Sequence, residues 1–403
     1  MRQIKFGDIR IGPIARGKIQ RALDKNWVTE GDNVAEFEER YAKKFGWKHC
    51  ITTSSGTTAG EVVWAAIREL SRKEKGIFHT GEIAGHSSIS DYYGGAITPA
   101  CAFVSTANCL FAAGLQPKFV DIDLETLNLS VPNLEEPRSP MMGEWPDWYG
   151  NIIGIQFVAT MGKPSPIGQL AAIADERSLY LIADMCEAHG ATLLGQRQYA
   201  DRYADAAIYS FYTAHLIVAG EGGAICTDDD DIAELCRSIK SHGRPLGDNF
   251  FLFDRIGFNA KWSDLHAAVD LESLEHFDEN FKRRRQVRAK LLEALSPFQD
   301  RLILYPDDPG EVIAPHAFPV VLRDENDNQR DLLLHLRQAG IEVKTLFWSL
   351  PTQHEAFKFM GHKLGDFPVA ESIGRRGLHF GCNEFMTDDD IDYIADTIRR
   401  FFT

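Results

Sequence analysis

The chain predicts an α/β fold: a large domain with a mostly parallel sheet covered by helices, followed by a small α+β C-terminal domain. Two observations predict it. Apolar strand-like runs alternate with helical patterns from residue 50 onward, as they do in parallel sheets. The length of 403 residues also exceeds what one simple core fills. We therefore expect an N-terminal arm over 1–30, a large domain over 31–260, a long connecting helix within 261–300 and a small domain over 301–403.

The N-terminal part predicts two helices. Apolar residues recur at helical spacing from Ile19 to Leu23 and again from Val34 to Tyr41. Between them, Trp27–Gly31 breaks the pattern. The first helix therefore belongs to the arm and the second opens the large domain.

The large domain predicts strands that end next to polar residues. The expected strands are Lys118–Asp123, Ile152–Phe157, Leu179–Ile182 and Ala206–Ser210, with a helix over Ile167–Arg177. Ligands of open α/β sheets bind outside the carboxyl ends of the strands. Asp184 and Ser210 both fall at such ends, so both are candidates for ligand contacts.

The C-terminal third begins with one long amphipathic stretch. Ser263–Leu295 carries apolar residues every three or four positions, and Lys282–Arg285 within it predicts a solvated helix face. Pro306–Pro315 is typical of a domain linker. After it we expect a strand over Ala317–Leu322 and helices over Gln329–Ala339 and Asp388–Phe402.

Composition narrows the function classes. The net charge of −15 disfavours binding to nucleic acid and to anionic membrane surfaces. The start of the chain has no signal-peptide core and no apolar run is long enough for a bilayer, so we expect a cytoplasmic protein. The seven cysteines have no C-x-x-C pair, which predicts free thiols and no metal site. Between Ser71 and Gly95 an irregular segment, either functional or loosely ordered, holds two histidines with little weight as metal ligands.

Two local patterns favour a phosphorylated ring cofactor. Thr53–Thr58, at the start of a helical pattern, offers hydroxyl groups and backbone N–H groups that suit phosphate. Asp184 ends a buried strand, where its carboxylate needs a partner, and a protonated ring nitrogen would serve. Each pattern alone also fits a helix cap.

Taken together, an ordered set of motifs resembles one family. The set comprises Trp27–Gly31, Ser55–Thr57, Phe103–Asn108, Asp184–Gly190, Ser210–His215, Gly220–Gly223 and Gly257–Asn259. It is similar to the motifs of the DegT-type nucleotide-sugar aminotransferases, which use pyridoxal 5′-phosphate (PLP). The resemblance runs through nearly the whole chain and implies the aspartate-aminotransferase-like fold, fold type I.

The resemblance implies how the cofactor phosphate is held. Ser55, Gly56, Thr57 and Ser210 match the positions that contact it in this family. Asn259 matches a residue that reaches the phosphate of a neighbouring subunit. A homodimer with shared active sites follows as an expectation.

The resemblance also assigns contacts to the cofactor ring. Phe103 matches the aromatic residue that stacks on the pyridine ring, and Asp184 matches the carboxylate that pairs with the ring nitrogen. Glu187 stands near the ring hydroxyl, where glutamine is usual in the aminotransferases.

His215 occupies the position of the lysine that binds PLP as a Schiff base in this family. An imidazole has no primary amine, so we expect the cofactor to be bound non-covalently. His215 and Lys261 are both similar to the branch that removes the C3 hydroxyl from nucleotide-linked 4-keto-6-deoxy sugars. That resemblance implies a dehydratase of deoxysugar biosynthesis that uses pyridoxamine 5′-phosphate (PMP). His215, with a pKa near neutrality, would be the base and Asp184 would keep the ring protonated.

This branch has two subtypes, one of which carries a cysteine-bound [2Fe–2S] cluster. No close cysteine group follows His215, so the sequence favours the cluster-free subtype, which regenerates PMP from glutamate. Two alternatives stay open. One is an atypical aminotransferase or deaminating enzyme of the same fold, and the other is a non-catalytic protein that binds cofactor or sugar.

Overall fold

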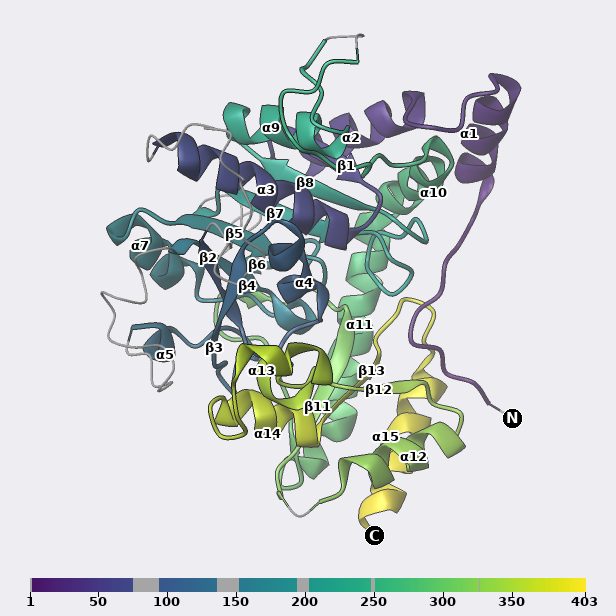
Figure 1. Cartoon of the computed structure of the whole chain (residues 1–403). Helices are drawn as coiled ribbons and strands as arrows, with labels where there is room; N and C mark the ends of the chain where they lie inside the picture. Colours follow the sequence, from purple (N-terminus) through teal and green to yellow (C-terminus); the bar gives the residue numbers. More distant parts are fainter. Residues whose placement is uncertain (1, 75–93, 136–151, 194–202, 248–250, 326) are drawn as a thin grey trace.

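A computed structural model describes residues 2–74, 94–135, 152–193, 203–247, 251–325 and 327–403 (Figure 1). Its centre is a seven-stranded sheet of order β1-β8-β7-β5-β4-β2-β3. Every pairing from β7 to β3 is parallel, and β8 runs antiparallel to both of its neighbours. The strands are β1 (His49–Thr53), β2 (Gly95–Pro99), β3 (Gln116–Val120), β4 (Ile152–Val158), β5 (Tyr180–Asp184), β7 (Ala206–Ser210) and β8 (Gly223–Thr227). The predicted α/β class is confirmed.

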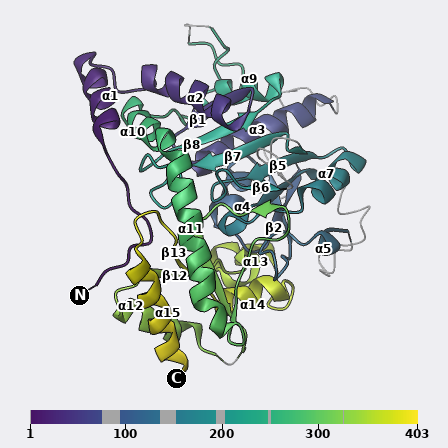
Figure 2. The same cartoon turned by 180° about the vertical axis from the view of Figure 1, so that it is seen from behind.

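Helices cover both faces of this sheet (Figures 1 and 2). One face packs on α2 (Asp32–Phe45), α7 (Ile167–Glu176) and α10 (Asp264–Glu275), and the other on α3 (Gly56–Glu74), α4 (Ser105–Ala112) and α9 (Asp230–Lys240). Strand β7 shows why: Ala207 and Tyr209 point to the first core, while Ala206 and Ile208 point to the second. Since side chains alternate along a strand, a strand buried on both faces is apolar throughout.

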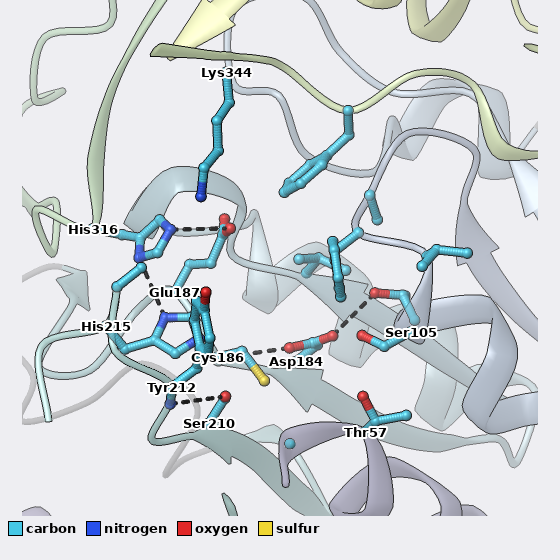
Figure 3. Close-up of a pocket in the computed structure, with 18 of the residues that line it drawn as sticks. Thr57, Ser105, Asp184, Cys186, Glu187, Ser210, Tyr212, His215, His316 and Lys344 are labelled. Carbon is cyan, nitrogen blue, oxygen red and sulfur yellow. Dashed lines mark hydrogen bonds and ion pairs between the residues drawn. The ribbon is translucent and has the colours of Figure 1, made fainter. Parts of the chain in front are cut away.

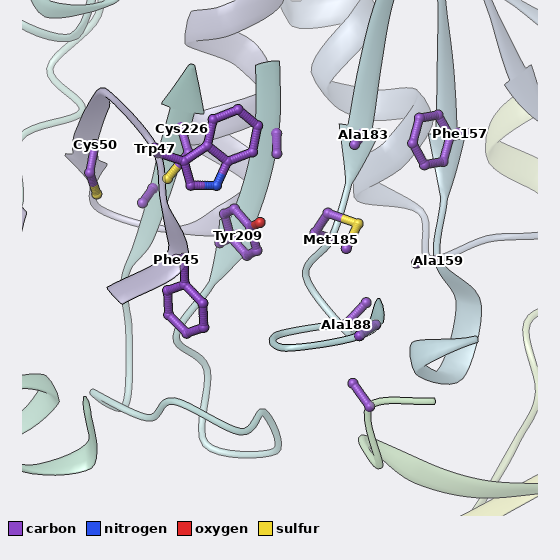
Figure 4. Close-up of a cluster of buried hydrophobic side chains, with 14 of the residues drawn as sticks. Phe45, Trp47, Cys50, Phe157, Ala159, Ala183, Met185, Ala188, Tyr209 and Cys226 are labelled. Carbon is purple, nitrogen blue, oxygen red and sulfur yellow. The ribbon is translucent and has the colours of Figure 1, made fainter. Parts of the chain in front are cut away.

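The first core contains two of the cysteines. Cys50 and Cys226 lie among buried aromatic side chains such as Phe45, Trp47 and Tyr209 (Figure 4). Cys236 is buried in the second core. These thiols are therefore small packing residues, as expected for Cys226 and Cys236.

The C-terminal part forms a second, four-stranded sheet of order β12-β13-β11-β9. Its strands are β9 (Leu302–Ile303), β11 (Ala317–Leu322), β12 (Val343–Thr345) and β13 (Gly377–Gly381). A separate core joins it to α11 (Phe277–Leu295), α12 (Gln329–Gln338) and α15 (Asp388–Phe402). This is the expected smaller α+β part, although the exact domain boundaries stay predictions.

The remaining elements lie outside these two sheets. They are α1 (Pro13–Asp24), α5 (Val131–Glu135), β6 (Thr192–Leu193), β10 (Glu311–Val312), α13 (Leu350–Gln353), α14 (Pro368–Arg376) and 3-10 turns at Thr160–Gly162, Ser296–Phe298 and Glu355–Met360. The N-terminal segment before α1 extends toward the C-terminal part (Figure 2), where Ile4 forms an isolated bridge with Ile341. In the described ranges no helix is long and apolar enough to cross a membrane.

Three details of the sequence prediction are wrong. The stretch Ser263–Leu295 is two helices, α10 and α11, which meet at His276. Lys282–Arg285 is not solvated throughout, because Arg284 is only 1% exposed and lies in an ion pair with Glu384, although Lys282 is exposed. The proposed linker Pro306–Pro315 contains β10, which pairs with β6. The segment between Ser71 and Gly95, which the sequence predicts to be irregular, lies largely outside the described residues.

Candidate active site

A cavity of about 720 Å³ opens where the carboxyl ends of β5 and β7 meet the start of α3 and the edge strand β12 of the smaller sheet. The strand-end position is the one expected for an open α/β sheet, and the volume suits a ligand of cofactor size. The cavity brings together eight of the nine residues predicted from the sequence, namely Ser55, Gly56, Thr57, Phe103, Asp184, Glu187, Ser210 and His215.

One end of the cavity is built from hydroxyl groups and a helix start. Helix α3 begins at Gly56, so the backbone N–H groups of its first turn have no partner within the helix. A Cβ atom on Gly56 would lie 2.7 Å from the Cβ of Ser210, and one on Gly223 would lie 2.4 Å from the backbone of Ser55. These glycines allow the strand ends and the helix to approach closely. The resulting cradle fits a phosphate group.

Asp184 ends β5 and is buried, with 7% of its surface exposed. The hydroxyl of Thr106 donates to its Oδ2 at 3.1 Å and the N–H of Cys186 donates to its Oδ1 at 3.2 Å. Burial raises the pKa of the Asp184 carboxyl, and these hydrogen bonds oppose the rise. A carboxylate held at this strand end fits a protonated ring nitrogen, which would supply the missing counter-charge.

His215 follows β7 and is 8% exposed. Burial, followed by the charges of Arg284 and Lys344, lowers the pKa of His215 to about 3. The expectation of a near-neutral pKa is therefore wrong for the protein alone, because two cations face a buried ring. An anionic ligand in the cavity would move this pKa back upward.

Arg284 holds the backbone of His215. Its Nη2 donates to the His215 carbonyl at 3.0 Å, and its Nε donates to the Glu384 carboxylate at 2.6 Å. The guanidinium thus ties α11 both to the loop that carries the histidine and to the segment before α15.

Replacing Arg284 by Met should destabilise the fold by on the order of 3 kcal/mol, because a carboxylate and a carbonyl lose their buried partner. The measurement is the urea midpoint of unfolding. The exposed neighbour Lys282 is the matched control, and Lys282→Met should change stability by no more than about 0.5 kcal/mol. Equal losses in both variants would contradict the buried role of Arg284.

The structure adds residues to which the sequence motifs assign no role. His316 Nδ1 lies 3.2 Å from His215 Nδ1, and His316 Nε2 lies 3.4 Å from Glu187 Oε1 (Figure 3). Lys344 and His379 line the same cavity from β12 and β13. All three come from the C-terminal part, whose sequence carries no motif for them. The one sequence signal that could have indicated them is a polar residue next to a predicted strand, as at His316, or within an edge strand, as at Lys344.

Two predicted residues lie away from the centre of the site. Phe103 lines the cavity with 57% of its surface exposed, and its ring centroid lies 6.1 Å from that of Phe347. Asn259 is absent from the residues that line the described cavity, and its Oδ1 accepts a hydrogen bond from Lys261 at 2.7 Å. Its assignment to a neighbouring subunit stays a prediction.

Of the seven cysteines, Cys186 lines the cavity and the others are buried elsewhere. Within the described residues, no three His, Cys, Asp or Glu side chains gather as metal ligands would.

Comparison with known proteins gives a consistent result. A model of the DegT/DnrJ/EryC1/StrS aminotransferase family matches residues 11–80 and 88–399. A GDP-4-keto-6-deoxy-D-mannose 3-dehydratase of Escherichia coli is 27% identical over 94% of this chain and 95% of its own length. A GDP-perosamine synthase of Escherichia coli is 24% identical over 96% of this chain and 94% of its own length.

Solved structures show the same fold. An Escherichia coli GDP-4-keto-6-deoxy-D-mannose 3-dehydratase with bound hydrated PLP superposes with a TM-score of 0.80. It is 24% identical, and the match covers 98% of this chain and 99% of that one.

Proposed function

This chain belongs to the DegT/DnrJ/EryC1/StrS aminotransferase family, and from that premise we propose that it is a dehydratase that removes the C3 hydroxyl of a nucleotide-linked 4-keto-6-deoxy sugar. The family is one of PLP-dependent enzymes that modify nucleotide sugars. Its members that are similar to this chain include both dehydratases and enzymes named for amino sugars. The choice between them depends on the site.

The observation that carries the proposal is His215 inside an otherwise complete cofactor cavity. Asp184 and the cradle of Ser55, Gly56 and Ser210 line the same cavity as the imidazole. A protein that had merely lost its lysine would have no physical need for the rest of the cavity. When bound, the cofactor supplies an amine for the sugar ketone and a ring that accepts electrons.

The protein side chains have separate tasks. Asp184 holds a proton on the ring nitrogen through a charge-assisted hydrogen bond. The cradle at the start of α3 binds the phosphate, which replaces the covalent tether. His215 accepts a proton at its Nε2 and later delivers one to the departing hydroxyl group. Of the histidines that line the described cavity, His215 alone occupies the position of the family's lysine, so in this proposal one residue serves as both base and acid.

Incubation with PMP and a nucleotide 4-keto-6-deoxy sugar tests this directly. We expect the sugar to lose one water, measured by mass spectrometry across GDP, CDP, UDP and dTDP forms. Borohydride treatment should leave no cofactor attached to a lysine. An unchanged sugar in every form, or an amino sugar as the product, would contradict the dehydratase proposal.

A second candidate is an aminotransferase with a displaced lysine. Lys344 brings a primary amine into the cavity, and its Nζ lies 4.3 Å from the centroid of the Phe6 ring. A borohydride-trapped adduct that maps to Lys344 by peptide mass would support this candidate. Loss of the adduct in Lys344→Met would confirm the site.

The partners proposed with the dehydratase are a nucleotide sugar, glutamate as amino donor and a second copy of the chain. Glutamate should restore PMP after each turnover without a reductase, as expected for the cluster-free subtype. In the homodimer, Asn259 would complete the neighbouring cradle. A fully active monomer, measured by light scattering during turnover, would contradict the shared site. A cytoplasmic location is part of the same proposal.

A further inference from the structure

Three titratable side chains from distant parts of the chain form a continuous line at the cavity wall (Figure 3). His215 comes from the loop after β7, His316 from the residue before β11, and Glu187 from the turn after β5. The two imidazoles face each other through their Nδ1 atoms at 3.2 Å, with ring planes 36° apart. The other nitrogen of His316, Nε2, lies 3.4 Å from Glu187 Oε1.

The far end of the line is anchored by the backbone. The N–H of Met161 donates to Glu187 Oε2 at 2.7 Å. Met161 has a φ of 55°, in the left-handed region that non-glycine residues rarely adopt. The turn therefore keeps one Glu187 oxygen as an acceptor for Met161 and leaves the other for His316.

The near end of the line opens to the cavity. Within the described residues His215 Nε2 has no hydrogen-bond partner, and His215 lines the cavity. This nitrogen is thus the one that a bound sugar can meet.

Both histidines are neutral in the protein alone. Burial is the first cause, and it lowers the pKa of His215 to about 3 and the pKa of His316 well below its usual value. Burial, with a smaller effect from Asp184, raises the pKa of Glu187 to about 8. The charged or titratable groups that act on the histidines from the surrounding elements are Arg284, Lys344, His379 and His189. They include two cations, so an added positive charge on either ring is disfavoured.

A neutral imidazole has one N–H group and one lone pair, so only one of the two facing Nδ1 atoms carries a proton. If Glu187 is ionised, His316 must direct its Nε2–H to the carboxylate. Its Nδ1 is then the acceptor, and the proton between the rings belongs to His215 Nδ1. This leaves a lone pair on His215 Nε2.

If Glu187 is protonated, every step reverses. The carboxyl O–H donates to His316 Nε2, and His316 donates from Nδ1 to His215 Nδ1. His215 then carries its own proton at Nε2. The two arrangements differ only in which atoms hold the protons, because the heavy atoms stay in place.

We propose that Glu187, acting through His316, sets which ring nitrogen of His215 is protonated and so makes this residue a base in one state and an acid in the other. His316 is a positioning residue, since it acts through His215. The inference rests on the proposed dehydratase, whose chemistry needs both states in turn. Protons balance: Nε2 of His215 gains one, Nδ1 passes one to His316 Nδ1, and His316 Nε2 passes one to Glu187. Delivery to the leaving hydroxyl runs the same path backward.

Neutron diffraction of deuterated crystals of the full chain tests the relay without any turnover. Crystals are held roughly two pH units above and below 8, the value about which Glu187 titrates. At high pH we expect deuterium on His215 Nδ1 and His316 Nε2. At low pH we expect it on His215 Nε2 and His316 Nδ1. The same protonation of both rings at the two pH values would overturn the proposal.

Glu187→Gln should hold His215 in one protonation state, the one with its proton on Nε2. Because Met161 needs an acceptor, the amide oxygen stays with its N–H and the amide NH₂ group faces His316 Nε2. The variant should show His215 protonated at Nε2 at both pH values. Its turnover should fall by on the order of 10²–10⁴, since the base form is absent. The limb of the wild-type pH profile near pH 8 should also be absent. A Gln variant that keeps this limb would overturn the relay.

His316→Phe breaks the line and His379→Phe is its matched control. Both histidines are buried, both ring centroids lie within 6 Å of Phe6, and only His316 contacts His215. We expect the pH-dependent swap on His215 to vanish in His316→Phe and to persist in His379→Phe. A swap that persists in both variants would overturn the role of His316. Failure of the proposed function is distinguishable: the sugar would keep its mass while the protons still exchange places in the crystals.

Discussion

His215→Asn is expected to bind PMP and nucleotide sugar as the native chain does, yet to lose turnover by on the order of 10²–10⁴. Asparagine has a similar polar reach, so its amide can still meet His316 Nδ1. It cannot take up or release a proton, and general base and acid work at His215 Nε2 therefore stops. Single-turnover dehydration, followed by mass spectrometry with saturating PMP, measures the loss.

The matched control for this prediction is His379→Asn. His379 lines the same cavity, is buried, and its pKa is likewise lowered to about 3 by burial. It touches neither His215 nor Asp184 in the described structure, so its loss should stay well below that of His215→Asn. Dehydration by His215→Asn within ten-fold of the native rate would show that the base is another residue.

Asp184→Asn is expected to weaken retention of the cofactor by roughly 10–100-fold, because a charge-assisted hydrogen bond contributes about 1.5–3 kcal/mol. Turnover should fall further, since a neutral amide does not hold a proton on the ring nitrogen. The bound fraction after gel filtration, read from cofactor absorbance, measures the first effect. Asp121→Asn is the control: Asp121 is also a buried carboxylate, but it accepts N–H groups at the start of α14.

The same substitution should have the opposite effect on the fold of the cofactor-free protein. Burial raises the pKa of Asp184 above its unfolded value of about 3.9. The native state therefore binds more protons than the unfolded chain, and its stability falls as pH rises from the unfolded pKa to the folded pKa. Asp184→Asn removes this fall. The difference in unfolding free energy between the variant and the native chain should therefore shift in favour of the variant over that pH interval, and it should be constant above it. An unfolding free energy of the variant that decreases relative to that of the native chain as pH rises would contradict this account.

Sequence alone was enough to select the residues of local motifs that the structure brings to one cavity, while their roles there stay predictions. Ser55, Gly56 and Ser210 lie at element boundaries whose hydroxyl and glycine content is visible in the chain, and Asp184 ends an apolar run. The apolar runs also identified the strands at 152–157 and 206–210, because each is buried along almost its whole length.

The contributions from the C-terminal part were not predictable in this way. His316 and Lys344 reach the cavity because a second sheet lies against the first, and no local pattern encodes that packing. The prediction of a solvated face at Lys282–Arg285 failed for a related reason. Other parts of the fold cover the helix at Arg284, so this side of it is buried. The pKa of His215 is lowered first by burial and then by that same long-range neighbour, so its value followed only from the assembled structure.

The hydrogen bond from Arg284 to the carbonyl of His215 does not depend on which side chain residue 215 carries, because its acceptor is a backbone atom. A lysine, a histidine or an asparagine at 215 would present the same carbonyl to the guanidinium. The main chain at position 215 is thus secured independently of the side chain it carries, and we expect an exchange of side chains there to leave this hydrogen bond in place.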